Sequence, residues 1–358
     1  MVTYIFKSII YGSIVLWGVL TVVFFLFNVL PGDPARMMLD KREDSKQLNV
    51  INQKYAFDRS LIVQYALYLN DVSPISLHHN SKTAFTSLSA GKYRFRQIFS
   101  FSDYTLVFKA PYLRESFVRT GTPVTLILQN TFKNTLVLAF SSIGVALLLG
   151  LVFGIISALY KETFIDKLIL FISVIGMSLP SFFASIIIAW VFGFLLHKYT
   201  GLDMTGSLYE VDDYGRGSFL NVQNLILPAI TLGIRPLSVI IQLCRNSLLE
   251  VFSMDYIRTA TAKGLSRFIV IFKHALRNAL NPVVTAVSGW FASMLAGAVF
   301  VEYIFAWNGI GKEVVDALNK MDLPVVMGCV LFIASIFIII NIIVDLIYGY
   351  LDPRIRIS

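Results

Sequence analysis

Long apolar runs separated by shorter polar segments dominate the pattern along this chain. A membrane-spanning helix needs about 20 mostly apolar residues, and six runs are candidates for such helices. They cover Ile9–Leu30, Thr135–Tyr160, Leu168–Leu196, Leu225–Cys244, Val283–Phe305 and Leu323–Tyr350. The pattern therefore predicts an all-α integral membrane protein of about six transmembrane helices.

The first run has two competing interpretations, a signal peptide and a retained helix. A signal peptide has an apolar core of about 7–15 residues followed by a small-residue cleavage site. The run at Ile9–Leu30 is longer and continues into Asn28-Val-Leu-Pro-Gly-Asp33 without such a site. We therefore predict that residues 1–30 form a retained first transmembrane helix.

A region of mixed polarity, residues 31–134, separates the first run from the other five. It combines amphipathic pieces such as Leu61–Leu69 with polar stretches such as His78–Ser89. We expect a large extracytoplasmic loop that packs on the outer mouth of a pore or contacts a partner. Residues 135–350 then form the transmembrane core, with a cytoplasmic loop at 245–282, and residues 351–358 form a cytoplasmic tail.

The composition supports a lipid environment. Hydrophobic residues make up 56% of the 358 residues and charged residues only 15%, against about 25% charged residues in typical soluble domains. The net charge of +8 fits the excess of Lys and Arg in cytoplasmic loops of membrane proteins. The chain contains no motif that reads RNA or DNA, so nucleic acid is not an expected partner.

The distribution of basic residues predicts the orientation in the membrane. The short loops 197–224 and 306–322 hold few Lys and Arg residues among several acids. The loop between the fourth and fifth runs holds Arg245, Arg258, Lys263, Arg267, Lys273 and Arg277. We therefore expect both termini in the cytoplasm and residues 31–134 outside it.

The cysteines and histidines do not predict a disulfide or a metal site. Cys244 and Cys329 lie in apolar runs and are interpreted as small core residues. His78 and His79 are adjacent in a polar stretch, but no third ligand candidate accompanies them, so no metal is expected.

The cytoplasmic loop contains the most informative pattern, which predicts two short helices. Ser253 is positioned to cap the first helix and Gly264 to end it in a left-handed turn. Ser266 is positioned to cap the second helix, and Pro282 fits the start of the fifth span. An apolar face at helical spacing comprises Phe268, Ile269, Phe272, Leu276 and Ala279. Physically, such a helix suits either an anionic lipid surface or a protein groove.

A family resemblance favours the protein groove. Asp255-Tyr-Ile-Arg-Thr-Ala-Thr-Ala-Lys-Gly-Leu265 followed by His274-Ala-Leu-Arg-Asn-Ala-Leu-Asn-Pro282 resembles the coupling loop of ABC-importer permeases, closest to the dipeptide, oligopeptide and nickel permease family. The general loop consensus has Glu-Ala-Ala where this chain has Arg258, Thr259 and Ala260. Weaker resemblances follow in family order at Pro31–Pro34, Ser178–Phe182, Leu227–Thr231, Val301–Gly311 and Leu351–Arg354.

The resemblance implies a type I permease fold in a bacterial inner membrane. It implies a second homologous permease, two ATP-binding subunits and an external solute-binding protein as partners. The residues implied in docking the ATPase are Asp255, Tyr256, Arg258, Thr259, Ala260, Lys263 and Gly264. The chain has no Gly-x-x-x-x-Gly-Lys-[Ser/Thr] motif, so no cofactor is expected on it. ATP and Mg²⁺ are expected on the partner ATPase subunits.

Several polar or helix-distorting residues lie within the predicted spans. Arg235 is an intramembrane charge, either a contact for a substrate carboxylate or a structural residue that bonds carbonyls or lies near the surface. Pro180 and Pro228 either kink helices along a solute pathway or only shape packing. Glu302 is read as a gate contact or, preferably, a solvated carboxylate, and Tyr303 and Trp307 fit an aromatic belt.

Two other functional classes compete with an ATP-driven importer. A secondary transporter would show repeated halves and paired carboxylates near the midplane, and an intramembrane enzyme would show a catalytic motif such as His-Glu-x-x-His. Neither pattern is found in the sequence. We therefore favour an importer subunit for dipeptides, oligopeptides, nickel chelates or similar solutes.

Overall fold

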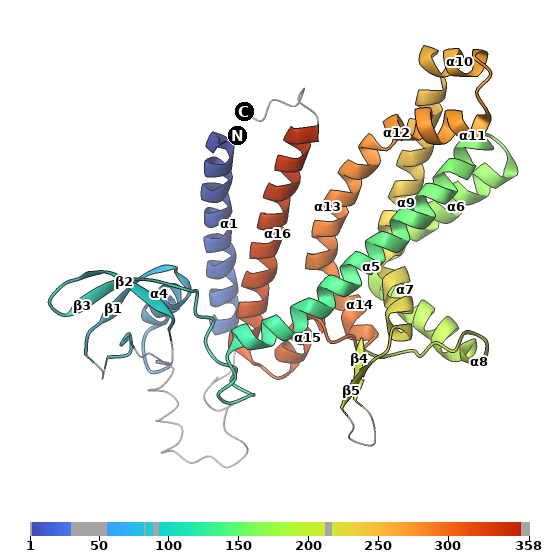
Figure 1. The fold of residues 1–358 in the computed structure, drawn as a ribbon. Coiled ribbons are helices and arrows are strands. Elements are labelled where there is room, and N and C mark those ends of the chain that lie inside the picture. The colour runs from blue at the N-terminus through green and yellow to red at the C-terminus, as the bar shows by residue number, and fades with distance from the viewer. Residues whose placement is uncertain (1, 30–55, 82–83, 89–92, 212–216, 352–358) are drawn as a thin grey trace. The chain divides into compact units, whose positions relative to one another are not determined.

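A computed structural model describes residues 2–29, 56–81, 84–88, 93–211 and 217–351 (Figure 1). The motif Pro31–Pro34 and the tail after Leu351 lie outside the described residues. The chain divides into two compact units. One comprises Met1–Gly12, Thr131–Lys312 and Ile333–Ser358, and the other comprises Ser13–Asn130 and Glu313–Phe332.

Four described helices are long and apolar enough to cross a membrane: α1 (Val2–Val29), α5 (Val124–Leu159), α9 (Gln223–Phe252) and α16 (Leu323–Leu351). A fifth candidate is a bent pair, α6 (Phe164–Ser178) with α7 (Ser181–Ile188) and its π-helical continuation η1 (Ala189–Leu195). The structure thus confirms a multi-pass architecture, with four or five spans among the described residues by length and composition.

Two predicted spans are not single helices. In place of one helix over Leu168–Leu196, α6 and α7 meet at an angle of 111°. Pro180 lies at this break with an extended backbone, φ −60° and ψ 139°, because a proline offers no amide hydrogen and disfavours helix in the residue before it. The predicted Val283–Phe305 helix is likewise divided into α13 (Asn281–Gly297) and α14 (Val299–Ile304).

Strands make the all-α prediction incomplete. β1 (Ile75–His79), β2 (Phe95–Ser100) and β3 (Tyr104–Lys109) form an antiparallel sheet in the order β1-β3-β2. It follows α4 (Leu61–Val72) within the predicted loop. A two-stranded hairpin joins β4 (Tyr209–Val211) and β5 (Ser218–Leu220). Alternating burial along β3 is the period-2 pattern of a strand.

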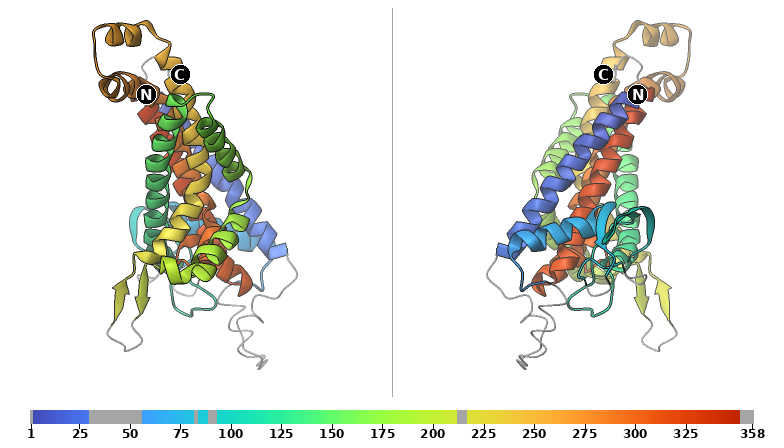
Figure 2. Two further views of the ribbon diagram at one scale, coloured as in Figure 1. Left: turned by 90° about the vertical axis from the view of Figure 1, so that its right-hand side faces the viewer. Right: turned by 90° about the vertical axis from the view of Figure 1, so that its left-hand side faces the viewer.

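The core of the first unit is built on α9. The helix α6 packs against α9, and α5 approaches α9 at Gly150 and Gly154; the three helices are the green and yellow ribbons in Figure 2. A Cβ added at Gly154 of α5 would lie 2.7 Å from the Cβ of Cys244, so only glycine permits this close approach. Cys244 and Cys329 are both buried and free, which confirms their interpretation as core residues. A buried cluster packs α9 against the segments that follow it; its members include Ile240, Leu248, Ile257, Val270, Ala275 and Ala279.

Short helices complete the described chain. The turns after α9 are α10 (Asp255–Ala262), α11 (Arg267–Ile269), η2 (Val270–Ala275) and α12 (Leu276–Ala279). α8 (His197–Thr200) precedes the hairpin, and α15 (Ile310–Asn319) precedes α16.

Candidate functional site

The helix α10 lies beyond one end of α9, at the opposite end of its unit from α8 and the β4–β5 hairpin (Figure 1). Its N-cap residue is Met254, which makes no side-chain cap. The predicted cap Ser253 instead donates from Oγ to the carbonyl of Glu250, 2.6 Å away, because α9 continues to Phe252. That detail of the prediction is wrong, whereas the helix itself is confirmed.

One side of α10 anchors it to the unit. Ile257 and Ala260 are buried in the cluster on α9. Asn278 Nδ2 of α12 donates to Tyr256 Oη at 2.8 Å. The helix ends before Gly264, whose φ of +76° confirms the predicted left-handed turn. The apolar side of α10 is thus packed on α9, and a hydrogen bond joins it to α12.

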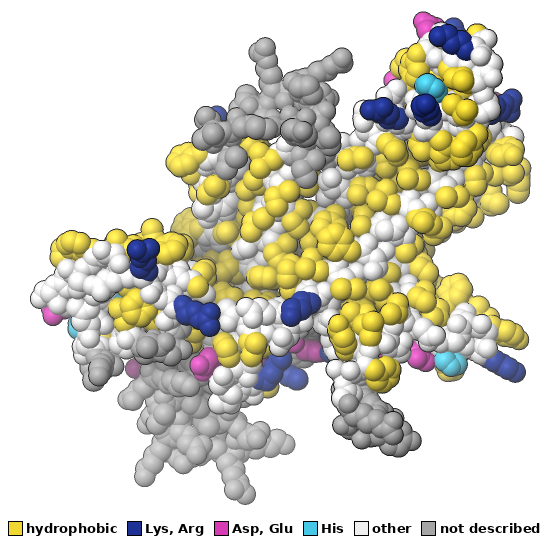
Figure 3. All heavy atoms as spheres, in the orientation of Figure 1, with side chains coloured by type: hydrophobic (Ala, Val, Ile, Leu, Met, Phe, Trp, Pro, Cys, Tyr) yellow, Lys and Arg dark blue, Asp and Glu magenta, His cyan; other side chains and the backbone are white. Residues whose placement is uncertain are grey.

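The other side of α10 is exposed. Of the seven residues implied in docking, six are exposed together and only Ala260 is buried. Arg258 Nη1 lies 3.5 Å from Asp255 Oδ1, with the two side chains 74% and 96% exposed. Such a solvated pair contributes little to stability, so both charges are available to a partner. Figure 3 shows Lys and Arg side chains on and around these short helices.

The apolar face predicted for the second helix is partly wrong. Phe268, Ile269 and Phe272 are exposed, and the rings of Phe268 and Phe272 pair at 4.5 Å. The buried side is formed by Val270, Ala275 and Ala279. The cause is the π-helical turn η2, whose i→i+5 bonds shift the side-chain register away from the 3.6-residue period. The predicted cap is confirmed, since Ser266 Oγ accepts from the amide of Ile269, and Pro282 lies in the first turn of α13.

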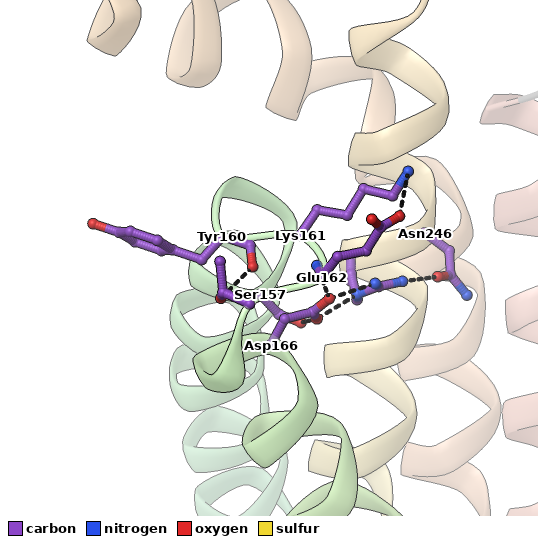
Figure 4. A network of polar contacts seen from close by, with 8 residues as sticks. Ser157, Tyr160, Lys161, Glu162, Asp166 and Asn246 are labelled. Atoms are coloured by element: carbon purple, nitrogen blue, oxygen red, sulfur yellow. Dashed lines mark hydrogen bonds and ion pairs between the residues drawn. The ribbon is translucent and has the colours of Figure 1, made fainter.

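A buried ion pair holds the end of the unit near α10 (Figure 4). Arg245 of α9 donates from Nε and Nη2 to the two carboxylate oxygens of Asp166, each at 2.7 Å. Ser157 Oγ of α5 and the amide of Glu162 donate to the same carboxylate. The Asp166 side chain is only 2% exposed. This cluster joins α5, α6 and α9, and the sequence pattern had not paired its members.

Glu302 is the buried hub of a second polar cluster. It accepts from Thr135 Oγ1 at 2.7 Å, from the Gly311 amide at 2.6 Å and from the Lys312 amide at 3.3 Å. Glu302 is fully buried, so its interpretation as a solvated carboxylate is wrong. A Cβ at Gly309 would lie 2.3 Å from the carboxylate, which explains the glycine there.

The aromatic belt is corrected in part. Trp307 is fully buried and donates from Nε1 to the carbonyl of Asn134 at 3.0 Å. It therefore packs inside the protein rather than in the membrane interface. Tyr303 is 43% exposed.

The three residues that were predicted to line the solute pathway differ in position and in burial. Arg235 is exposed on α9, with its guanidinium 6.0 Å from the ring centroid of Trp290 on α13. Pro228 is buried inside α9, and Pro180 is exposed at the start of α7. Arg235 alone among the three offers a charge to a solute.

Comparison with known families identifies the chain. A family described as the inner membrane component of binding-protein-dependent transport systems matches residues 150–357, and the family of the N-terminal part of such components matches residues 1–88. The chain belongs to this family. It is accordingly a multi-pass inner-membrane transport component and not an enzyme, and α10 and both polar clusters of the first unit lie largely within the matched region.

Curated relatives resemble this transport component over most of its length. It is 32% identical to a dipeptide transport system permease protein, DppB, of Alkalihalophilus pseudofirmus, over 99% of this chain and 100% of the relative. It is 42% identical to DppB of Haemophilus influenzae over 66% of this chain and 75% of the relative. It is 32% identical to a glutathione transport system permease protein, GsiC, of Salmonella paratyphi A over 99% of each.

Proposed function

We propose that this transport component is a pore-forming permease subunit of an ATP-driven ABC importer for dipeptides, oligopeptides or similar small solutes. Full-length similarity to permeases named for dipeptide and glutathione transport supports the solute class. Because those names differ in solute, the proposal names a class of solute rather than one peptide.

The observation that carries the proposal is the geometry of α10, which is anchored on one side and exposed on the other. A rigid projection of this kind can transmit the motion of another subunit to α9. We propose that Asp255, Tyr256, Arg258, Thr259, Lys263 and Gly264 face an ATPase subunit and that Ala260 secures the helix from behind. ATP and Mg²⁺ are bound by the partner, and closure of two such subunits rocks the permease between inward-open and outward-open states.

The proposed assembly contains this chain, a second homologous permease, two ATP-binding subunits and an external solute-binding protein. Six spans are reached by counting α6 with α7 as one and α13 with α14 as one. Both termini and α10 then lie in the cytoplasm, and residues 31–134 lie outside it. The basic loop around α10 (Figure 3) supports this orientation.

Reversal of the charge at Arg258 tests the coupling. Arg258→Glu is expected to reduce recovery of the ATPase subunits with the permease, and ATP-dependent uptake into vesicles, by about tenfold or more, because a repulsive contact costs over 1.4 kcal/mol. Lys198→Glu is the matched control, since Lys198 is exposed on α8 at the other end of the unit. Normal recovery and uptake with Arg258→Glu would remove α10 from the interface, and uptake without any ATPase subunit would indicate a secondary transporter.

We further propose that Arg235 binds a peptide carboxylate in the solute pathway, between helices that are bent by Pro180 and Pro228. A substitution of Arg235 tests this role. Arg235→Gln is expected to lower uptake of a peptide with a free carboxylate by about tenfold or more, since a charge-assisted hydrogen bond contributes about 1.5–3 kcal/mol. A C-terminally amidated peptide should lose less, and Arg235→Lys should retain part of the uptake. Equal uptake of the free peptide by wild type and Arg235→Gln would refute this role.

A further inference from the structure

The antiparallel sheet β1-β3-β2 of the second unit buries several polar side chains and exposes apolar ones, which is the reverse of a sheet that faces water. Its buried positions include the polar residues Ser76, His78, Thr105 and Lys109. The register places His79, opposite Tyr104, and Arg96, opposite Phe108, on the other side of the sheet. The remaining side chains there are apolar and are called here the apolar sheet face: Ile75, Leu77, Phe99, Tyr104, Leu106 and Phe108. Five of these six side chains are between 46% and 56% exposed, and Leu106 is half-buried. Water would favour the reverse arrangement.

The strand register makes this face continuous. Ile75 of β1 lies opposite Phe108 of β3, and Leu77 lies opposite Leu106. Across the other edge of β3, Phe99 lies opposite Leu106. A bulge between Gln97 and Phe99 leaves Ile98, 54% exposed, beside the same strand pair. Figure 3 shows hydrophobic side chains along the upper margin of this sheet.

Hydrogen bonds on the buried side determine which face of the sheet is buried. The carboxylate of Asp71, at the end of α4, accepts from Tyr93 Oη at 2.8 Å and from Arg114 Nε at 3.0 Å. Lys109 Nζ donates to the Asp71 carbonyl. The His78 ring is bonded to Ser76 Oγ and to the Thr86 carbonyl. These buried groups are satisfied where they are, so the apolar sheet face is held outward.

The helix α4 is attached to α1 near one end of the apolar stretch of α1. Tyr65 Oη lies 2.6 Å from Thr21 Oγ1 of α1, and the ring of Tyr68 stacks on Phe24 at 5.8 Å. Both α1 residues belong to the apolar stretch Phe6–Phe27. At 1.5 Å per residue, Thr21 lies about 9 Å inside the Phe27 end of that stretch. Interfacial amphipathic elements insert to a similar depth, about 5–10 Å.

Neighbouring side chains extend the surface and add the chemistry of a lipid headgroup region. On α4, Ile62 is 75% exposed and Leu61 40%. On α1, Val22 and Leu26 are 65% and 56% exposed, on the helix against which α4 packs through Tyr65 and Tyr68. Arg94 and Arg96 are exposed on and beside β2. Aromatic rings with arginines are typical of the membrane–water interface, where the guanidinium reaches phosphate.

We propose that the apolar sheet face and the exposed side of α4 bind phospholipid, dipping into the leaflet that holds the C-terminal end of α1. The occupant is lipid rather than a protein because α4, the neighbour of the sheet, packs directly on the apolar span of α1. This contact would add to the packing of α4 on α1 and would fix the depth of the sheet in the leaflet. The inference does not depend on the solute or on the ATPase.

Spin labels test the proposal in the assembled transporter reconstituted in phospholipid nanodiscs. Single cysteines would replace Leu77, Phe99 and Phe108 in a background in which the buried Cys244 and Cys329 are changed to alanine. At these three sites, collision with oxygen should exceed collision with the water-soluble Ni-EDDA complex severalfold. Ser102→Cys, in the exposed turn between β2 and β3, is the matched control and should show the reverse.

Other outcomes overturn the proposal. High Ni-EDDA collision at the three sites would mean a water-facing surface, and low collision with both reagents would mean a protein partner. If the cysteine variants fail to assemble, the unmodified transporter can be labelled with a phospholipid carrying a photoreactive group near its headgroup. Adducts are then expected within 75–79 and 95–108 as well as on α1, and adducts on α1 alone would contradict the proposal.

Discussion

Arg245→Ala is expected to destabilise the permease by about 3–5 kcal/mol. The substitution removes two 2.7 Å hydrogen bonds and leaves the Asp166 carboxylate, 2% exposed, without its counter-charge. Breaking one partner of a buried ion pair has a cost of this size. The midpoint of thermal unfolding, followed by intrinsic fluorescence in detergent, should fall by roughly 4–7 °C.

A double-mutant cycle separates the pair from its surroundings. Asp166→Asn combined with Arg245→Met should be less destabilising than the sum of the two single changes by about 1 kcal/mol or more. Arg267→Ala is the control, because Arg267 is exposed on α11, and its unfolding midpoint should match wild type. Additive effects in the cycle, or an unchanged midpoint for Arg245→Ala, would show that the pair does not hold α6 to α9.

Glu302→Ala is expected to have the second large effect, a loss of about 3 kcal/mol or more in stability. The carboxylate connects α5 through Thr135 with the first turn of α15 through the Gly311 amide. Its removal leaves buried donors unsatisfied, at about 1–3 kcal/mol each, and opens a cavity. The same thermal unfolding measurement reports the change, and uptake should fall with the folded fraction.

Two control substitutions show whether the effect of Glu302→Ala comes from the loss of its buried hydrogen bonds. Asp203→Ala removes a carboxylate that is 58% exposed and 3.7 Å from His197 Nδ1, and it should leave the unfolding midpoint unchanged. Thr135→Val removes one donor to Glu302 and the acceptor of the Ile310 amide, and it should have an intermediate effect. A Glu302→Ala protein as stable as Asp203→Ala would mean that the buried hub contributes nothing to the fold.

Local sequence patterns were sufficient to predict several helices, turns and caps of this protein, and also its family. Apolar length identified α1, α9 and α16, because lipid selects about 20 consecutive apolar residues whatever lies beside them. The turn at Gly264, the cap at Ser266 and the start of α13 at Pro282 depend on one or two residues each. The order of the motifs along the chain was sufficient to predict the family, and the family match over residues 150–357 confirms that prediction.

Contacts between residues that are far apart in the sequence could not be predicted from local patterns. Asp166 and Arg245 are 79 residues apart, and no periodicity states that α6 lies against α9. Glu302 resembled a solvated end of a span until Thr135 and Gly311 were found around it. The π-helical turn η2 rotated the apolar face of the segment after Gly264, and Val270 and Ala275 of this turn pack in the cluster on α9. The inverted sheet has the same origin, because strand pairing and the Asp71 contacts together determine which face is left exposed.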